Sequence, residues 1–143
     1  MEEYYEASII GVYQLTMGTE DLYAVLLECK EWEGLVLPIF IGKYEAMAIQ
    51  MALENYKPIR PLTHDLMIHI LDTLGIAIEK VTIDAMVGNY FTATIVLRSE
   101  DGKKWHIDAR PSDSIALALR TKAPIYIADR LKRHAISEEN LSI

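Results

Sequence analysis

The sequence predicts an α+β fold, in which a mixed, largely antiparallel sheet carries three main helices packed against it in a single domain. Three observations point to this class. A length of 143 residues suits one domain and is too short for two good cores. Segments that alternate apolar and polar residues are interrupted by segments with helical periodicity. Hairpin signals in both halves, in the element order βββααβββαβ, indicate a mixed layout and not a regular βαβ repeat.

Three strands are predicted before the first helix. Residues 7–17 alternate strictly between two faces and are rich in β-forming side chains. A turn cluster separates them from a returning strand at residues 22–30, and a third strand follows at residues 35–41. Pro38 cannot donate to a ladder, so we expect the third strand at an edge of the sheet or with an irregularity.

The periodicity changes to that of a helix after Gly42. Residues 43–55 carry apolar side chains at amphipathic helical spacing. A connector punctuated by prolines leads to a second predicted helix at residues 63–74. Gly75 then fits the position after a helix C-terminus, where a left-handed backbone is common.

The second half of the chain returns to strands. Asp101 and Gly102 give a strong hairpin signal. The last helix is apolar nearly all round, so we expect it to be buried. The elements predicted here are strands at residues 78–86, 90–98 and 104–109, the helix at 112–122, a strand at 124–128 and a helical turn at 129–133.

The domain is expected to span residues 1–133. Residues 134–143 form a polar C-terminal segment, in which Ser137, Glu138 and Glu139 resemble the opening of a truncated helix. We therefore expect the native polypeptide to continue beyond residue 143.

Composition indicates a globular cytoplasmic protein. The chain is 51% apolar and 24% charged, which argues against disorder. No apolar run approaches the ~20 residues of a membrane span, and the acidic start is not a signal peptide, so no membrane partner is expected. The single cysteine, Cys29, is expected to be a core residue in a reducing compartment. A homodimer or higher homo-oligomer would cover exposed strand edges.

The net charge of −7 disfavours a general nucleic-acid-binding protein. Such proteins gain most of their affinity by neutralising phosphates with Lys and Arg. A metal-dependent enzyme acting on nucleic acid remains open, because carboxylates would hold the cation and the cation would supply the positive charge.

Polar side chains gather at three boundaries where a strand or connector meets a helix. The second and third boundaries share Arg-Pro, then Thr63 or Ser112 at the expected N-cap, then an aspartate in the first turn. A purely structural interpretation is available. The hydroxyls would each contribute ~1 kcal/mol as caps. Glu45, Asp65 and Asp113 would complement the helix dipoles for ~0.3–1 kcal/mol apiece.

Two patterns favour a functional interpretation. The apolar stripe of the second helix places Asp65 nearly opposite and His64 at its rim, where the imidazole is free to meet another group. In the strand before the third helix, His106, Asp108 and Arg110 share one face. Such a set costs free energy on burial unless its members are paired or lie in a cleft.

If the three boundaries converge, their chemistry suits phosphodiester cleavage. Carboxylates favour Mg²⁺ or Mn²⁺, and helix N-termini with arginines receive phosphate oxygens. The sequence contains no HExxH, CxxC, GxSxG or P-loop motif. The predicted site residues are His64, Asp65, Asp108 and Asp113 as catalytic groups, Lys43, Arg60, Arg110 and Ser112 as substrate-binding groups, and Glu45, Asp108 and Asp113 as metal ligands.

These boundary segments resemble the bifunctional nuclease family. The similarity spans roughly residues 7–131 and is most specific at the third boundary. The matching segments are residues 37–42 (LPIFIG) with 45–46 (EA), 60–66 (RPLTHDL), 107–118 (IDARPSDSIALA) and 124–127 (PIYI). Family members are described as acting on both RNA and DNA, so the resemblance implies a nuclease here. The positions that match its motifs are Glu45, His64, Asp65, Asp108, Arg110, Ser112 and Asp113.

Two functions remain as hypotheses. The first is a small nuclease, assisted by Mg²⁺ or Mn²⁺, whose substrate is RNA or DNA. The second is a non-catalytic, self-associating binding or regulatory module. In that case, pairs between arginine and aspartate only hold the loops rigid.

Overall fold

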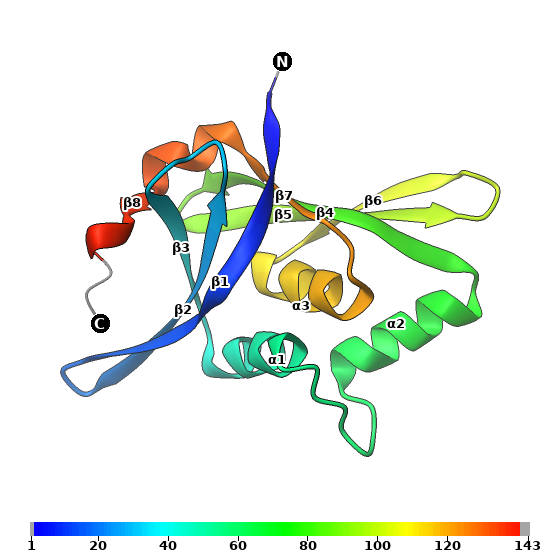
Figure 1. Cartoon of the computed structure of the whole chain (residues 1–143). Coiled ribbons are helices and arrows are strands. Elements are labelled where there is room, and N and C mark those ends of the chain that lie inside the picture. The colour runs from blue at the N-terminus through cyan, green and yellow to red at the C-terminus, as the bar shows by residue number, and fades with distance from the viewer. Residues whose placement is uncertain (1, 141–143) are drawn as a thin grey trace.

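One eight-stranded sheet organises the fold, with the strand order β6-β5-β4-β7-β1-β2-β3-β8 (Figure 1). The structure is a computed structural model and describes residues 2–140. Neighbouring strands are antiparallel except for β4 and β7, so the predicted mixed, largely antiparallel α+β class is confirmed. The strands are β1 (Tyr4–Met17), β2 (Glu20–Cys29), β3 (Leu35–Ile41), β4 (Ile76–Val87), β5 (Tyr90–Ser99), β6 (Lys104–Ala109), β7 (Ile125–Ala128) and β8 (Ile136–Ser137).

Strand β7 joins the two halves of the sheet. It pairs with β1 on one side and with β4 on the other, where Val81 lies opposite Ile125. The pairing with β4 is parallel because the chain returns through a crossover helix, as parallel neighbours require. The first three strands and the β4-β5-β6 meander therefore form one continuous sheet.

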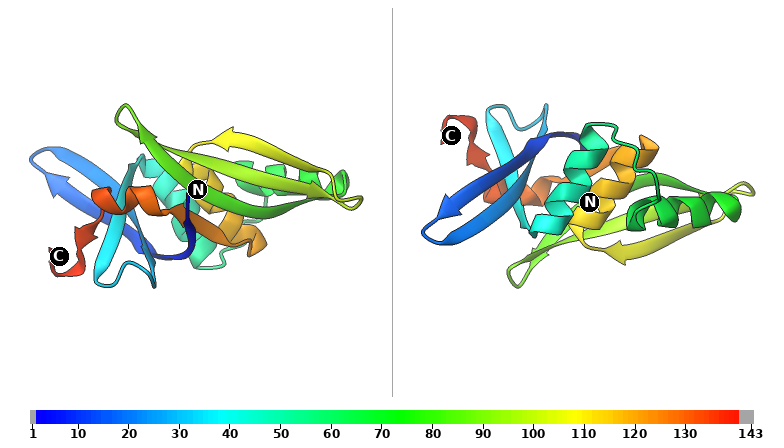
Figure 2. Two further views of the ribbon diagram at one scale, coloured as in Figure 1. Left: turned by 90° about the horizontal axis from the view of Figure 1, so that it is seen from above. Right: turned by 90° about the horizontal axis from the view of Figure 1, so that it is seen from below.

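The three α-helices of residues 2–140 are α1 (Lys43–Leu53), α2 (Thr63–Thr73) and α3 (Pro111–Thr121). All three lie on the same face of the sheet (Figure 2). The 3₁₀ segment η1 (Asp129–His134) packs into the same core, where its Leu131 is buried and its His134 ring meets Phe91 of β5 edge to face. Trp32 is also buried and donates its indole N–H to the Asp129 carboxylate at 3.1 Å.

Helix α3 is the centre of the core, as its apolar sequence predicts. Seven of its eleven residues are buried, and Ile115, Ala116 and Ala118 are fully inaccessible. The alanines let α1 approach closely, and α1 in turn buries Ala46 and Ile49. The burial of α3 therefore contributes most of the hydrophobic stabilisation of the helical layer.

Several finer expectations are also resolved. Pro38 lies where β3 has no ladder partner on its outer side, because β8 pairs only with Leu35 and Val36. Strand β8 was not predicted, since two residues carry no periodicity, and it lies within the expected polar tail. Residues Glu138–Asn140 form a 3₁₀ turn, and any helix after them lies outside the described residues.

Cys29 is buried, and burial raises the pKa of its thiol, as expected for a core residue.

No helix within residues 2–140 combines the length and the apolar character needed to cross a bilayer.

Replacing Ile115 with alanine should test whether α3 is the centre of the core. We expect a loss of about 2–5 kcal/mol in the free energy of unfolding, because the side chain is fully buried and its removal leaves a cavity. Urea denaturation measures the change. The control is Ile59→Ala, at a position that is 99% exposed, where the loss should stay within about 0.5 kcal/mol. Equal losses for the two variants would contradict the assignment.

Candidate active site

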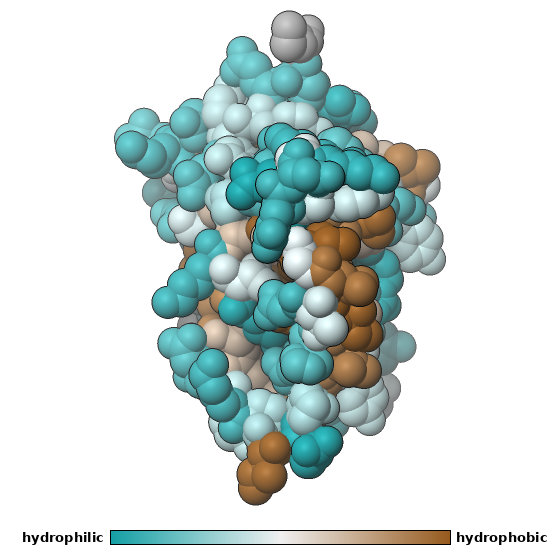
Figure 3. Space-filling view, turned by 90° about the vertical axis from the view of Figure 1, so that its right-hand side faces the viewer, coloured by the Kyte–Doolittle hydropathy of each residue, from teal (hydrophilic) through white to brown (hydrophobic). Residues whose placement is uncertain are grey.

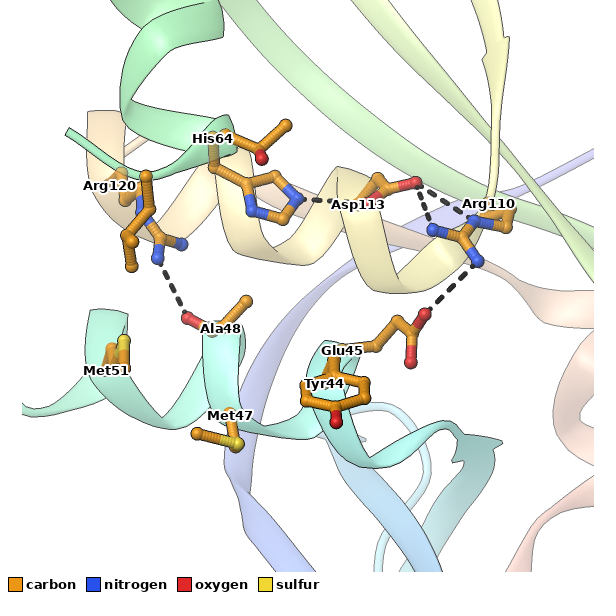
Figure 4. A pocket seen from close by; sticks show the side chains of 11 residues that line it. Tyr44, Glu45, Met47, Ala48, Met51, His64, Arg110, Asp113 and Arg120 are labelled. Atoms are coloured by element: carbon orange, nitrogen blue, oxygen red, sulfur yellow. Dashed lines mark hydrogen bonds and ion pairs between the residues drawn. The ribbon is translucent and has the colours of Figure 1, made fainter.

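A pocket of about 460 Å³ opens between α1, α3 and the start of α2 (Figure 4). Most of its wall is apolar, and a few charged side chains converge on it, which is typical of a ligand site. The lining residues are Tyr44, Glu45, Met47, Ala48 and Met51 from α1, Leu62, Thr63 and His64 around the start of α2, and Arg110, Asp113 and Arg120 around α3.

The Asp113 carboxylate is the central group of this site. Its Oδ1 lies 2.9 Å from Nε2 of His64. Its Oδ2 accepts hydrogen bonds from Nε and Nη2 of Arg110, both at 3.0 Å. Nη1 of Arg110 lies 3.4 Å from Oε1 of Glu45. A chain of hydrogen bonds and ion pairs therefore links the three helices: His64 from α2, Asp113 from α3 with Arg110 at its N-cap, and Glu45 from α1.

His64 is held in one orientation. Only 13% of its side chain is exposed, and Asp113 accepts a hydrogen bond from Nε2. A carboxylate partner on one ring nitrogen keeps the proton there and leaves the other nitrogen, Nδ1, as an acceptor. In Figure 4 that second nitrogen lies on the side of the ring toward α1. His64 thus meets another ionisable group, and it does so from the side of α2 that faces α3.

Arg110 presents a permanent positive charge at the mouth of the pocket. The hydrogen bond and negative charge of Asp113, followed by the charge of Glu45, raise the pKa of its guanidinium. Its side chain is 65% exposed. The planar fork of a guanidinium matches phosphate oxygens in pairs, so Arg110 is placed to meet an anionic ligand.

Arg120 is a residue that the sequence interpretation missed. Its side chain is only 11% exposed, and it donates hydrogen bonds to the carbonyls of Ala116 at 2.9 Å and Ala48 at 3.0 Å. A signal was present, because Asp113 and Arg120 are seven residues apart and therefore lie on one side of α3. Arg120 forms the inner end of the pocket opposite Arg110 (Figure 4).

Asp65 lies away from the charged chain and has local partners. It accepts the backbone N–H of Leu62 at 2.9 Å and lies 3.4 Å from Nε of Arg120. The carboxylate therefore caps α2 and ties its first turn to α3. The structure does not place Asp65 among the groups that line the pocket.

The expected hydroxyl caps are wrong for both helices. Thr63 is the first residue of α2 and Leu62 precedes it as N-cap, while Asp65 provides the capping carboxylate. The N-cap of α3 is Arg110, because Pro111 occupies the first helical position, where its missing N–H costs nothing. Ser112 is consequently buried inside the first turn and does not line the pocket.

The structure does not bring Asp108 to this site. Asp108 lies opposite Thr94 in the β5–β6 ladder, and strand alternation puts it on the same face as His106. His106 and Thr94 line a separate hollow beside Asp84, on the face of the sheet that the helices do not cover. Asp108 and Asp113 are thus separated by the sheet, although they are only five positions apart in sequence.

The expected ligand set of Glu45, Asp108 and Asp113 is therefore not assembled. Within residues 2–140, no group of three or more His, Cys, Asp or Glu side chains is arranged to hold a metal ion. Arg110 lies between the two carboxylates that do share the site. Lys43 begins α1 and Arg60 lies in the connector before α2; both are exposed, and neither lines the pocket.

Comparison with known proteins identifies related sequences. The sequence profile described as bifunctional nuclease domain matches residues 25–139. An uncharacterized protein of Mycobacterium tuberculosis is 39% identical over 100 residues, which are 69% of this chain and 58% of that protein. Bifunctional nuclease 2 of Arabidopsis thaliana is 27% identical over 106 residues, which are 73% of this chain and 32% of that protein.

A third relative is Bifunctional nuclease 1 of Oryza sativa subsp. japonica, 26% identical over 111 residues, which are 76% of this chain and 34% of that protein. The matched part of this chain thus spans 58% of the length of the mycobacterial relative and about a third of the plant proteins.

Two arginines of the site should differ in their effect on stability. Arg120→Met should lower the free energy of unfolding by about 2–3 kcal/mol, because two carbonyls and a carboxylate lose a mostly buried donor. Arg110→Met should cost less than about 1 kcal/mol, since its ion pairs are exposed to solvent. Thermal unfolding followed by circular dichroism compares the variants. A larger loss for Arg110→Met would show that the exposed pairs hold the helices together.

Proposed function

This chain belongs to the bifunctional nuclease domain family, and from that premise we propose that it hydrolyses phosphodiester bonds of RNA and DNA in the pocket at the helix starts. One observation carries the proposal. The Asp113 carboxylate contacts both His64, which it orients, and the exposed guanidinium of Arg110, and it does so beside an open pocket. The plant relatives named bifunctional nuclease support the same class of reaction.

His64 is the proposed general base. Because Asp113 holds the proton on Nε2, the free Nδ1 can take a proton from a water molecule in the pocket. The water oxygen then attacks phosphorus, and the bond from phosphorus to the departing sugar oxygen breaks. The imidazolium returns its proton to that oxygen, so the histidine is regenerated. Asp113 stabilises the imidazolium in the interval, as a carboxylate partner does in hydrolytic triads.

Arg110 is the proposed phosphate-binding group. Its contact with Glu45 is long, at 3.4 Å, and exposed, so a phosphate oxygen can replace it at small cost. The guanidinium then faces the charge that builds up on the phosphoryl oxygens, where a fixed donor lowers the barrier. Asp113 keeps the other edge of the guanidinium in place.

The proposed attack by water needs no 2′-hydroxyl group. A base that activates water can cleave both polymers, whereas a base that activates the neighbouring hydroxyl is restricted to RNA. The proposed mechanism is therefore compatible with a nuclease that accepts RNA and DNA. A chain with net charge −7 has to concentrate its positive potential locally, and Arg110 and Arg120 do so at the two ends of this pocket.

Substitution of the two central residues tests this assignment. Asp113→Asn and His64→Gln should each lower kcat for labelled RNA and single-stranded DNA by about 10²–10⁴-fold, the range of general-base contributions. Asp108→Asn is the matched control, because it removes a carboxylate from the uncovered face of the sheet. The protein is purified through two unrelated columns, so that cleavage can be shown to elute with the chain.

Each outcome of that assay separates the two hypotheses. Cleavage that falls for Asp113→Asn and His64→Gln but not for Asp108→Asn supports the nuclease. Equal cleavage by all four proteins would assign the activity to a contaminant or to another site. A parent protein that never cleaves, with Asp113→Asn lowering only the melting temperature, would favour the non-catalytic module.

Dependence on Mg²⁺ or Mn²⁺ is a separate prediction. It is tested by measuring cleavage in the presence of EDTA. The described side chains do not form a ligand cluster, so we assign no step to an ion. If ions act only by screening the polyanion, activity in EDTA should return on adding spermidine or monovalent salt. If activity returns only with Mg²⁺ or Mn²⁺, and the melting temperature rises with the same ions, a metal site must form when the substrate binds.

A further inference from the structure

Helix α1 has a second apolar side, which faces the pocket and not the core. Its buried residues are Ala46 and Ile49. The residues that line the pocket repeat at intervals of three and four, so they follow one side of the helix. We call this set the α1 strip, and it consists of Tyr44, Met47, Ala48 and Met51. Tyr44 is 78% exposed and Met47 45%, so the strip is open to solvent.

The polar groups on the other sides of the pocket are already engaged. Both oxygens of Asp113 have partners, in His64 and Arg110. Arg120 donates to two backbone carbonyls. The wall opposite α1 begins with Leu62, which is 39% exposed. A flat, mostly apolar group could therefore enter between α1 and Leu62 without breaking these hydrogen bonds.

An exposed cation lies at one end of the α1 strip. In Figure 4, Tyr44 lies at the same end of the pocket as Glu45 and Arg110, whereas Met51 lies toward Arg120. A phosphate held by Arg110 would place the nucleotide that carries it at the beginning of the strip. The pocket volume of about 460 Å³ falls within the range of roughly 300–1,000 Å³ that is typical of small-molecule sites. It can hold one nucleotide but not a stack of base pairs.

A wider apolar band adjoins the pocket on α2, but it lacks cations. Ile68 packs against the core, whereas Leu66 is 50% exposed and Ile70 49%. Figure 3 views the side of the molecule where α2 lies and shows apolar side chains gathered in a band on this face. The helix contains no Lys or Arg. The pocket, in contrast, combines an apolar wall with the exposed guanidinium of Arg110, the pairing that a nucleotide requires.

We propose that the α1 strip binds an unpaired nucleobase, so that the substrate of the pocket is a single-stranded polynucleotide. This inference rests on the proposed function, in which Arg110 holds the phosphate. The base of that nucleotide stacks on Tyr44 and packs against Met47 and Met51. An aromatic ring stacks on any base, and methionine adapts to different shapes. A paired base can reach the strip only after it leaves its stack, which costs free energy.

Cleavage of short, labelled DNA substrates tests the proposal. The parent should cleave the bond beside an abasic position at least about tenfold more slowly than the same bond in an intact single strand, because no base fills the strip. A fully paired strand should also be cleaved at least about tenfold more slowly. Strands that differ only in the base beside the bond should be cleaved within about tenfold of one another, since an apolar strip does not read base edges.

Three results of this assay would overturn the proposal. They are equal cleavage of the intact and abasic strands, equal cleavage of single and double strands, and a base preference beyond that range.

Met47→Ala separates the base site from the reacting groups. It should raise KM for single-stranded DNA about three- to tenfold and leave kcat within about twofold, since it removes apolar wall and no reacting group. The matched control is Met67→Ala, the same truncation at a residue of α2 that is 41% exposed, compared with 45% for Met47. Its KM should equal that of the parent. An equal rise in KM for both variants would assign binding to the band on α2 and contradict the proposal.

Equilibrium binding keeps this test apart from that of the proposed function. In the His64→Gln background, Met47→Ala should raise the Kd for labelled single-stranded DNA about three- to tenfold, whereas Met67→Ala should not; fluorescence anisotropy measures both. Circular dichroism checks folding, and alanine favours the helix at both positions. If the parent never cleaves but this difference in Kd is observed, the proposed function fails and the base site stands. If cleavage requires His64 while Met47→Ala leaves KM and Kd unchanged, the reaction stands and the base site is excluded.

Discussion

The burial of α3 is the constraint on which the rest of the structure depends. A helix with seven buried residues has to place its few charged side chains where it meets water or a partner. Asp113 and Arg120 emerge on one side of α3, two turns apart, and each binds the first turn of a neighbouring helix. The polar contacts that position α1 and α2 are thus consequences of how α3 enters the core.

The same contacts supply the groups that suit hydrolysis. Asp113 needs partners for both oxygens because it is partly buried, and His64 and Arg110 provide them. A histidine that stabilises the fold in this way is also held in the tautomer that a general base needs. Arg110 remains mostly exposed, so its charge is available to an anion. The structural and functional interpretations of these residues are therefore compatible, and activity measurements distinguish them.

The orientation of α2 sets the position of His64. The inner side of the helix packs Ile68 against the core, whereas Leu66, Ile70 and Leu74 are largely exposed. Two polar contacts join the same side to α3, from His64 to Asp113 and from Asp65 to Arg120. The packing of α2 on α3 therefore decides where the imidazole lies.

The sequence by itself determined the elements and the chemistry of the helix starts. Alternation and helical spacing are local properties, and they located nearly every strand and helix as well as Glu45, His64, Arg110 and Asp113. Only the tertiary structure decided the central place of β7, the outward stripe of α2, the role of Arg120 and the separation of Asp108 from Asp113. The physical reason is that spacing fixes which residues share a face of one element. Which face is buried, and what meets it, is set by contacts between residues far apart in the chain.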